Sequence, residues 1–325
     1  MQIGYFPPPN KSNSYTINMY KLLGDIGEVS PVTPKRFIDF FKKQKFDFVF
    51  INWLENKAFR KDGRILISGI MYSIAWFLIL KLKSKKVVYV KHNNYPHNSK
   101  GLAKKLGFLL IDFFVRYADV VIVHSPASVT NSKMVYIPHP LYNVELMQDA
   151  QNPVADKEYY ICFGRIEKYK KIHELINHWP KDKCLKIQGI CCDEEYLSTL
   201  VEMSVGKKIT ISTVFISDED AYSLLKNSQG MIIPSDSDSM IVSGSFFFAM
   251  TVKTPVIAIS TPFLNSFSDT KNFIFLIDSM KNINFALENL QVGRSVVTED
   301  FVNNFSDERI RSMLKDSIFK SPSPN

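Results

Sequence analysis

The sequence is poor in cysteine and lacks any cysteine pair at metal-binding or redox spacing. The four cysteines form no CxxC pattern and lie in or beside apolar segments. This usage argues against a disulfide framework, and no group of Cys, His and carboxylate residues has metal-ligand spacing. We therefore predict reduced, structural thiols in a cytosolic protein without a metal site. The cysteines are Cys162, Cys184, Cys191 and Cys192.

We also expect no secretory signal and no bilayer-spanning run. Met1–Phe6 leads into three prolines without a basic leader. The most apolar stretch, Ile65–Leu80, falls short of the roughly 20 residues that a spanning helix needs. A basic turn and the strand Lys86–Val90 follow it, so we predict the crossover helix of a βαβ unit, buried against the sheet. A membrane span is the less favoured alternative.

Acidic residues are fewer than basic residues in this chain of 325 residues. It carries 40 Lys and Arg against 32 Asp and Glu, a net charge of +8, which favours an anionic partner such as nucleic acid, a nucleotide or an acidic membrane. Nucleic acid is disfavoured, because the cations follow strands or lie on one helix without a recognised binding module. No internal repeat is present, and the length suffices for two domains of ordinary size.

Short apolar strands alternate with helices twice along the chain. A polar segment without periodicity, 143–157, separates the two series. This alternation predicts an α/β protein with two doubly wound, Rossmann-like parallel sheets that face a cleft. A last helix is expected at Asp307–Phe319. The predicted domains are 1–145 and 156–305, followed by the helix and tail 306–325.

The stretch Ile232–Ala258 predicts a strand, a polar loop, a helix and a second strand. The helix opens at Ser243, Gly244 and Ser245. A helix that begins with small residues after a strand offers free N–H groups to an anion such as a phosphate. An ordinary serine N-cap is the alternative.

A second segment of the same kind is Tyr159–Lys171. Its apolar strand ends in Gly164 and Arg165, and Lys170 precedes a helix. Glycine allows a close backbone approach, and Arg and Lys supply charge and donors to phosphate oxygens. This segment raises the expectation of a diphosphate site.

Together the two segments resemble the C-terminal domain of GT-B glycosyltransferases of the family 4 type. That family has a Gly-Arg pair followed by a Lys, and a later helix ending in an Ala-Met-like pair, here Ala249 and Met250, before a Pro-Val-Ile strand. The resemblance implies a GT-B fold, a last helix that returns to the first domain, and a nucleotide-sugar substrate with no cofactor or metal. The implied donor-binding residues are Gly164, Arg165, Lys170, Ser243, Gly244 and Ser245.

The strand Phe46–Ile51 ends in a segment similar to the Asp-x-x-x-x-His-Trp-x-Glu stretch of some bacterial exopolysaccharide glycosyltransferases. Asp47, Trp53 and Glu55 match, and Asn52 replaces the His. A carboxylate just past a strand end is placed to take a proton from an acceptor hydroxyl, so Glu55 is a candidate base. A solvated surface glutamate is the alternative.

Lys91–Asn98 resembles the His-Asn-x-x-Pro-His-Glu stretch of the same branch, with Asn98 in place of the Glu. We expect His97 to touch the transferred sugar or to act as the base; a histidine that only hydrogen-bonds its loop is equally favoured. A loop after the first strand of such a sheet also faces ligands, although 10–15 can equally be a connector. The expected sugar and acceptor residues are His92, Asn93, Asn13 and Tyr15.

Lys100–Tyr117 predicts a basic amphipathic helix. Its apolar stripe can simply pack inward, yet its second half has few polar residues, which is typical of a helix at an anionic leaflet. We therefore expect a peripheral protein on the inner face of the cell membrane that takes a saccharide or polyprenyl-diphosphate-linked acceptor.

The resembled retaining enzymes carry two glutamates that this chain lacks, because Met240 and Phe248 stand at those positions. We predict an inverting glycosyltransferase of capsule, O-antigen or exopolysaccharide synthesis, with Asp236 and Asp238 as reserve bases behind His97 and Glu55. The alternatives are a retaining transferase with an atypical site and an inactive GT-B domain that binds a partner or lipid.

Overall fold

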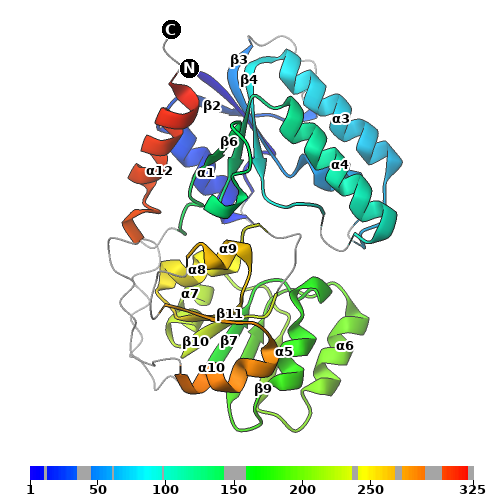
Figure 1. The fold of residues 1–325 in the computed structure, drawn as a ribbon, viewed down its shortest axis with the longest axis vertical. Helices are drawn as coiled ribbons and strands as arrows, with labels where there is room; N and C mark the ends of the chain where they lie inside the picture. Colours follow the sequence, from blue (N-terminus) through cyan, green and yellow to red (C-terminus); the bar gives the residue numbers. More distant parts are fainter. Residues whose placement is uncertain are drawn as a thin grey trace. The chain divides into compact units, whose positions relative to one another are not determined.

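The structure, a computed structural model, contains two compact α/β units (Figure 1). Unit 1 comprises the described parts of Met1–Pro140 and Asn303–Asn325 together with residues 241–242, and unit 2 comprises those of Leu141–Ser237 and Ser243–Val302. Each unit contains one six-stranded sheet with parallel pairing throughout, so the predicted pair of parallel sheets is confirmed. The described residues are 1–10, 13–34, 45–60, 62–96, 99–142, 159–235, 241–267, 273–289 and 302–320.

The sheet of unit 1 has the strand order β2-β1-β3-β4-β5-β6. Each inner strand contains a short apolar run, because helices cover both faces of a parallel sheet. The chain goes from β1 to the edge strand β2 and then returns to the other side of β1, so the order reverses between β1 and β3. Ligands bind at the carboxyl ends of strands at such a reversal. The strands are β1 (Gln2–Phe6), β2 (Glu28–Pro31), β3 (Phe46–Asn52), β4 (Ser84–Lys91), β5 (Val120–Val123) and β6 (Met134–Tyr136).

Two helical layers cover this sheet. The helices are α1 (Ser14–Gly24), α3 (Ile67–Leu82), α4 (Gly101–Tyr117) and α12 (Asp307–Leu314), with the short helices η2 (Leu54–Ala58), η3 (Pro126–Ser128) and η6 (Lys315–Phe319). On one face Met19 of α1 and Ile310 of α12 share a buried cluster with β1. On the other face Phe77 of α3 and Phe114 of α4 share a second buried cluster with β3 and β4.

Helix α3 connects the parallel neighbours β3 and β4 and packs its inner face on the sheet, so the predicted crossover helix is confirmed. Its inner face approaches η2 so closely that a Cβ on Gly69 would lie 1.9 Å from the Lys57 carbonyl oxygen. Its outer face is apolar and solvent-exposed. No helix in the described part of the chain is long and apolar enough to cross a membrane. The large apolar residues of the outer face, 45–73% exposed, are Ile67, Met71, Leu78 and Leu82.

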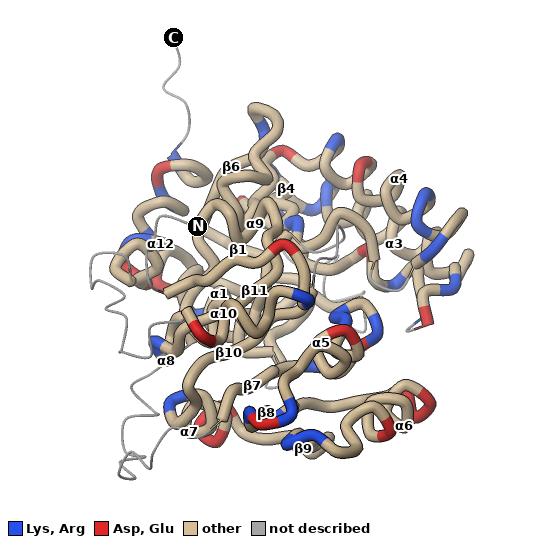
Figure 2. Tube along the Cα trace, turned by 60° about the horizontal axis from the view of Figure 1, so that its bottom comes forward, with Lys and Arg blue, Asp and Glu red and all other residues tan. Residues whose placement is uncertain are grey.

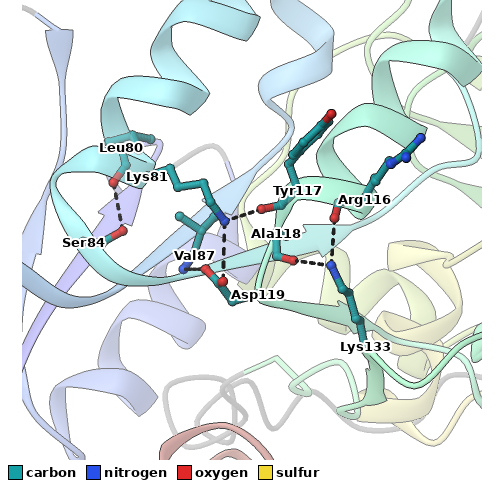
Figure 3. A network of polar contacts seen from close by, with 9 residues as sticks. All are labelled: Leu80, Lys81, Ser84, Val87, Arg116, Tyr117, Ala118, Asp119 and Lys133. Carbon is teal, nitrogen blue, oxygen red and sulfur yellow. Dashed lines mark hydrogen bonds and ion pairs between the residues drawn. The ribbon is translucent and has the colours of Figure 1, made fainter.

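Two lysines hold the end of α4 in place (Figure 3). Lys81 Nζ donates to the carbonyl oxygen of Tyr117 at 2.6 Å. Lys133 Nζ donates to the carbonyl oxygens of Arg116 at 2.7 Å and Ala118 at 3.2 Å. Terminal carbonyls of a helix have no partner within the helix and carry partial negative charge, so these cations satisfy them and fix α4 beside α3 and β6.

The sheet of unit 2 has the strand order β12-β11-β10-β7-β8-β9. This is the order of a dinucleotide-binding sheet, and it reverses between β7 and β10. The reversal places the carboxyl ends of β7 and β10 side by side. The strands are β7 (Tyr159–Phe163), β8 (Cys184–Gln188), β9 (Ile209–Ser212), β10 (Gly230–Ile233), β11 (Val256–Ile259) and β12 (Ile274–Ile277).

The helices of unit 2 are α5 (Ile172–His178), α6 (Glu194–Met203), α7 (Asp218–Lys226), α8 (Gly244–Val252), α9 (Pro262–Asn265) and α10 (Ile283–Asn289), with η4 (Lys168–Lys170) and η5 (Met280–Asn282). Helix α8 is the central one, because every residue from Phe246 to Val252 is buried. A helix that is apolar all round belongs in a core. Its burial fixes the direction in which its first turn points.

The sequence pattern missed four short elements, namely β2, α9, β12 and α10. Each spans only four to seven residues, so periodicity gives little signal. The sequence also predicts a helix at about Pro34–Lys43, and nearly all of it lies outside the described residues, as do the polar segment 143–157 and the tail at 321–325.

Candidate active site

The predicted donor residues converge at the strand-order reversal of unit 2. Gly164 follows β7 directly and has a φ of +115°, which L side chains rarely adopt. A Cβ at this position would lie 2.8 Å from Ser245 Oγ and 2.9 Å from Lys170 Nζ. The Ser245 hydroxyl in turn donates to the Phe163 carbonyl oxygen at 3.0 Å. Three segments that are distant in sequence therefore meet at one point where only a glycine fits.

Gly189, which the sequence analysis did not single out, follows the neighbouring strand β8 and packs against Gly164. A Cβ on Gly189 would lie 2.0 Å from the Gly164 carbonyl oxygen. The Gly164 N–H donates to the Gln188 carbonyl oxygen at 3.0 Å, which holds the two strand ends together. The available signal was a glycine immediately after a buried strand, at the edge of the sheet where ligands bind.

Lys170 is a cation without an anionic partner in the described part of the chain. Burial lowers the pKa of its ammonium group, and nearby Arg165 lowers it further, while Cys162 and Glu167 act in the opposite direction. An unpaired ammonium in a desolvated position costs free energy unless an anion joins it. The neighbouring Lys168, by contrast, is exposed and pairs with a carboxylate 2.8 Å away.

The first turn of α8 supplies donors beside Lys170. Ser243 Oγ accepts from the Phe246 N–H at 3.3 Å, so the N-cap interpretation is confirmed for Ser243. The N–H groups of Gly244 and Ser245 have no hydrogen-bond acceptor among the described residues. They lie at the positive end of the helix dipole and remain available to an anion.

Arg165 is exposed at the same loop, next to Gly164. Its guanidinium group presents several N–H donors suited to a diphosphate and makes no hydrogen bond or ion pair among the described residues. Phe248 lies in the core of unit 2, with its ring 5.4 Å from that of Phe163 and 4.7 Å from that of Tyr142. The Phe248 side chain therefore stabilises α8 by packing and offers no polar group to a ligand.

A second polar cluster lies at the carboxyl ends of the strands in unit 1. Tyr15, at the start of α1, forms a 2.9 Å hydrogen bond between its hydroxyl and Nε2 of His124, just after β5. His124 Nδ1 lies 2.8 Å from the Ile137 carbonyl oxygen. A carbonyl only accepts, so Nδ1 carries the proton and Nε2 accepts from Tyr15. The Tyr15 oxygen keeps its lone pairs for a further donor.

His92 and Trp53 join this cluster. His92 Nε2 lies 3.1 Å from Asn52 Oδ1, and the imidazole stacks on the Trp53 indole with ring centres 4.0 Å apart. Tyr15 contacts both rings edge-on. The Tyr15 and His139 rings are 4.9 Å apart. The predicted residues Tyr15 and His92 are therefore neighbours.

The three histidines of this cluster are held neutral. Burial lowers the pKa of His124 to about 4. It lowers the pKa of His139 to about 3, helped by the nearby His124, and the pKa of His92 falls well below its usual value for the same reasons. Neutral rings act as hydrogen-bonding and stacking surfaces rather than as cations.

Glu55 is fully buried in η2, which corrects the alternative of a solvated surface glutamate. One carboxylate oxygen accepts from the Tyr89 hydroxyl at 2.9 Å, and the other, Oε1, has no partner in the described part of the chain. Burial raises the pKa of Glu55 to about 7. It faces the cluster beneath α3 and α4, opposite to the face that carries Tyr15.

The other predicted residues fall into two groups. Asn13 is the N-cap of α1 and is half-buried, and Asn93 is buried after β4. His97 and the two reserve aspartates at positions 236 and 238 lie outside the described residues. Among the described residues, no three His, Cys, Asp or Glu side chains are grouped as metal ligands.

The fold is that of the GT-B glycosyltransferases, with two Rossmann-like α/β domains. HepE of Anabaena, solved with UDP-glucose, superposes with a TM-score of 0.67 at 12% identity over 98% of this chain and 99% of its own. Sucrose-phosphate synthase of Thermosynechococcus elongatus gives 0.69 at 14% identity over 97% of both chains. A glycosyltransferase of Rickettsia africae gives 0.64 at 14% identity, covering 98% and 99%. No family model and no curated protein sequence matches this chain.

Proposed function

We propose that this protein is a glycosyltransferase that moves a sugar from a nucleotide diphosphate to a glycan or lipid-linked saccharide in surface polysaccharide synthesis. The observation that carries the proposal is the meeting of Gly164, Lys170 and Ser245 at the strand-order reversal of unit 2. The nucleotide-sugar is a substrate, and the proposal includes no metal and no other cofactor.

The chemistry of that point fits a diphosphate. Among the described residues, no carboxylate pairs with the Lys170 ammonium group and no acceptor binds two N–H groups at the positive end of the α8 dipole. Gly164 leaves room for oxygen atoms where a side chain would collide with Lys170. A diphosphate leaving group carries developing negative charge, which these donors are placed to stabilise.

Replacing Lys170 by Met tests the donor site. We expect the affinity for UDP, measured by calorimetry, to fall roughly 10- to 100-fold, because a charged hydrogen bond contributes about 1.5–3 kcal/mol. The ligand-free melting temperature should stay equal or rise, since the substitution removes an unpaired, desolvated cation.

Lys168→Met is the matched control, because Lys168 lies in the same short helix but pairs with Asp193. UDP affinity should be unchanged in this variant. Equal UDP affinity in wild type and Lys170→Met would contradict the proposed donor site.

We further propose an inverting displacement in which His97 is the first candidate for the base and Glu55 the second. An inverting reaction needs a base for the acceptor hydroxyl and donors for the leaving diphosphate. Support comes from Phe248, which is packed in the core where the resembled retaining enzymes carry a glutamate. Glu55 is buried beneath Tyr89, so an acceptor hydroxyl reaches it only if η2 moves.

We also propose that unit 1 binds the acceptor and rests on an anionic membrane from which a polyprenyl-diphosphate-linked acceptor is taken. The outer faces of α3 and α4 support this. Both carry exposed large apolar residues, and α4 has three cations in its helical span against the single carboxylate of Asp112 (Figure 2). Such a combination suits insertion between acidic lipid headgroups.

An inactive GT-B subunit is the second candidate function. The observation in its favour is that no exposed carboxylate accompanies Tyr15 and His92 among the described residues of their cluster. UDP binding without any transfer or hydrolysis of a nucleotide-sugar would select this alternative.

A further inference from the structure

Trp53 lies at a strained turn at the end of β3. Its φ of 48° and ψ of 30° place a bulky residue in the left-handed region, where non-glycine residues are uncommon. The turn is at the strand-order reversal of unit 1, and strained backbone is concentrated at sites that bind ligands. The energetic cost of this turn therefore indicates a constraint beyond simple packing.

The indole of Trp53 rests on a rigid support. It is stacked on His92 with an interplanar angle of 15°, and His92 is held by Asn52 Oδ1. The Asn52 amide donates to the Phe6 carbonyl oxygen at 3.1 Å, which anchors the support to β1. Tyr15 adds an edge contact at 5.5 Å. A fixed aromatic ring loses little conformational entropy when a ligand packs on it.

Trp53 is also the one tryptophan of the chain that stays partly exposed. The chain has three tryptophans, and the other two, Trp76 and Trp179, are only 3% and 2% exposed. A buried polar group without a hydrogen bond among the described residues lies at the same edge of the sheet. The Ser125 hydroxyl, next to His124, is buried and has no partner among the described residues, and such groups are satisfied in most native structures.

We infer that Trp53 is the stacking platform for a sugar ring of the acceptor. The C–H face of a pyranose is apolar and matches an aromatic face, while its hydroxyls need hydrogen bonds at the ring edge. The Tyr15 hydroxyl oxygen is available to accept one of them. This inference rests on the proposed function, because it concerns the acceptor side of that transfer.

Fluorescence of the wild-type protein tests this platform directly. The probes are the methyl glycosides of glucose, galactose, mannose and N-acetylglucosamine, together with lactose and cellobiose. At least one should shift the tryptophan emission to the blue and protect it from iodide quenching, because only Trp53 is open to solvent. If none of these sugars does so, the inference is wrong.

Substitutions at Trp53 separate ligand binding from structure. Asparagine tolerates positive φ, so Trp53→Asn keeps the turn while it removes the ring. For the sugar that causes the largest fluorescence change in wild type, we expect calorimetry to show an affinity at least tenfold lower in Trp53→Asn. The loss of affinity should be smaller in Trp53→Phe. Trp76→Phe, on the buried inner face of α3, is the control that should bind the sugar normally. Unchanged sugar affinity in folded Trp53→Asn would overturn the inference.

UDP binding distinguishes the two hypotheses. Trp53→Asn should bind UDP as wild type does, because Lys170 and the first turn of α8 belong to unit 2. Wild-type protein that binds a sugar at Trp53 but not UDP would refute the proposed donor site alone. Protein that binds UDP but no sugar would refute the Trp53 platform alone.

Discussion

At the scale of single residues, polar groups without a partner among the described residues identify candidate positions for ligand binding and for pH-dependent stability. Lys170 and the Glu55 carboxyl both lack a partner for part of their hydrogen-bonding capacity among the described residues. The two differ in access, because Lys170 is partly exposed and Glu55 is fully buried. We therefore expect ligand binding to depend on Lys170, and the pH dependence of stability to depend on Glu55.

Replacing Glu55 by Gln should change how stability varies with pH. The folded-state pKa of about 7 lies above the ordinary value of 4.5, so the folded protein holds this proton more tightly than the unfolded chain. Wild-type stability due to this group is present below about pH 4.5 and is lost as the pH rises through about 7. Glu55→Gln should therefore gain about 3 kcal/mol relative to wild type between about pH 4 and about pH 8.

Urea unfolding of both proteins across this pH range measures the difference. Glu202→Gln, at an exposed position on α6, is the control and should follow the wild-type curve. Parallel curves for Glu55→Gln and wild type would show that the carboxyl is not desolvated. Transferase activity of Glu55→Gln also separates the two candidate bases, because loss of activity in a stable protein favours Glu55 over His97.

At the scale of elements, helix α3 has one face in the core and one apolar face exposed to solvent. Its inner face, with Phe77 and Leu80, builds the core over β3 and β4, while its outer face is apolar and exposed. A single charged residue, Lys81, lies within the helix and is bound to the end of α4. An uncharged exposed face of this length is unusual for a helix that meets only water, so we expect it to be covered.

Binding to lipid vesicles tests the outer face of α3. Wild type should bind vesicles that contain phosphatidylglycerol, and salt should weaken this binding because the cations of α4 contribute to it. Met71→Glu and Leu78→Glu should each reduce binding about tenfold, as a partly inserted apolar side chain contributes about 1–2 kcal/mol.

Val205→Glu is the matched control for this experiment. Val205 is 79% exposed and lies in unit 2, so the same charge change should leave vesicle binding intact. Binding that ignores both lipid charge and the α3 substitutions would contradict membrane docking by this face.

At the scale of the whole molecule, the two proposed binding sites lie in two units with separate cores. Unit 2 carries the cationic point around Gly164, and unit 1 carries the neutral cluster of Tyr15, His92 and Trp53. The charge difference suits a diphosphate in one unit and a saccharide in the other. Transfer is then a property of the complete chain.

The stereochemistry of the product tests the mechanism at this scale. We expect NMR of the product to show an anomeric configuration opposite to that of the donor sugar, because a buried Phe248 replaces the glutamate of the resembled retaining enzymes. The donor nucleotide for the assay is the one that most raises the melting temperature. Retention of configuration would contradict a single displacement.

The sequence by itself determined the alternation of elements and the donor motif. Buried parallel strands are continuous apolar runs, and glycine, arginine and lysine after such a run are readable as a phosphate site. The predicted strand at β7, the helix start at Ser243 and the role of α4 as an amphipathic helix all follow from local pattern. The sequence pattern did not predict the edge strand β2, because three of its four residues are polar or exposed.

Only the tertiary structure decided which side chains meet and which are left without partners. Gly189 presses on Gly164 across two strands, Trp53 stacks on His92 across two strand ends, and Glu55 is buried by a helix that follows it. None of these contacts is local, and burial depends on what the rest of the chain places against a residue. Helix α3 shows the same dependence, because packing buries the face that lies on the sheet and leaves its apolar outer face open to solvent.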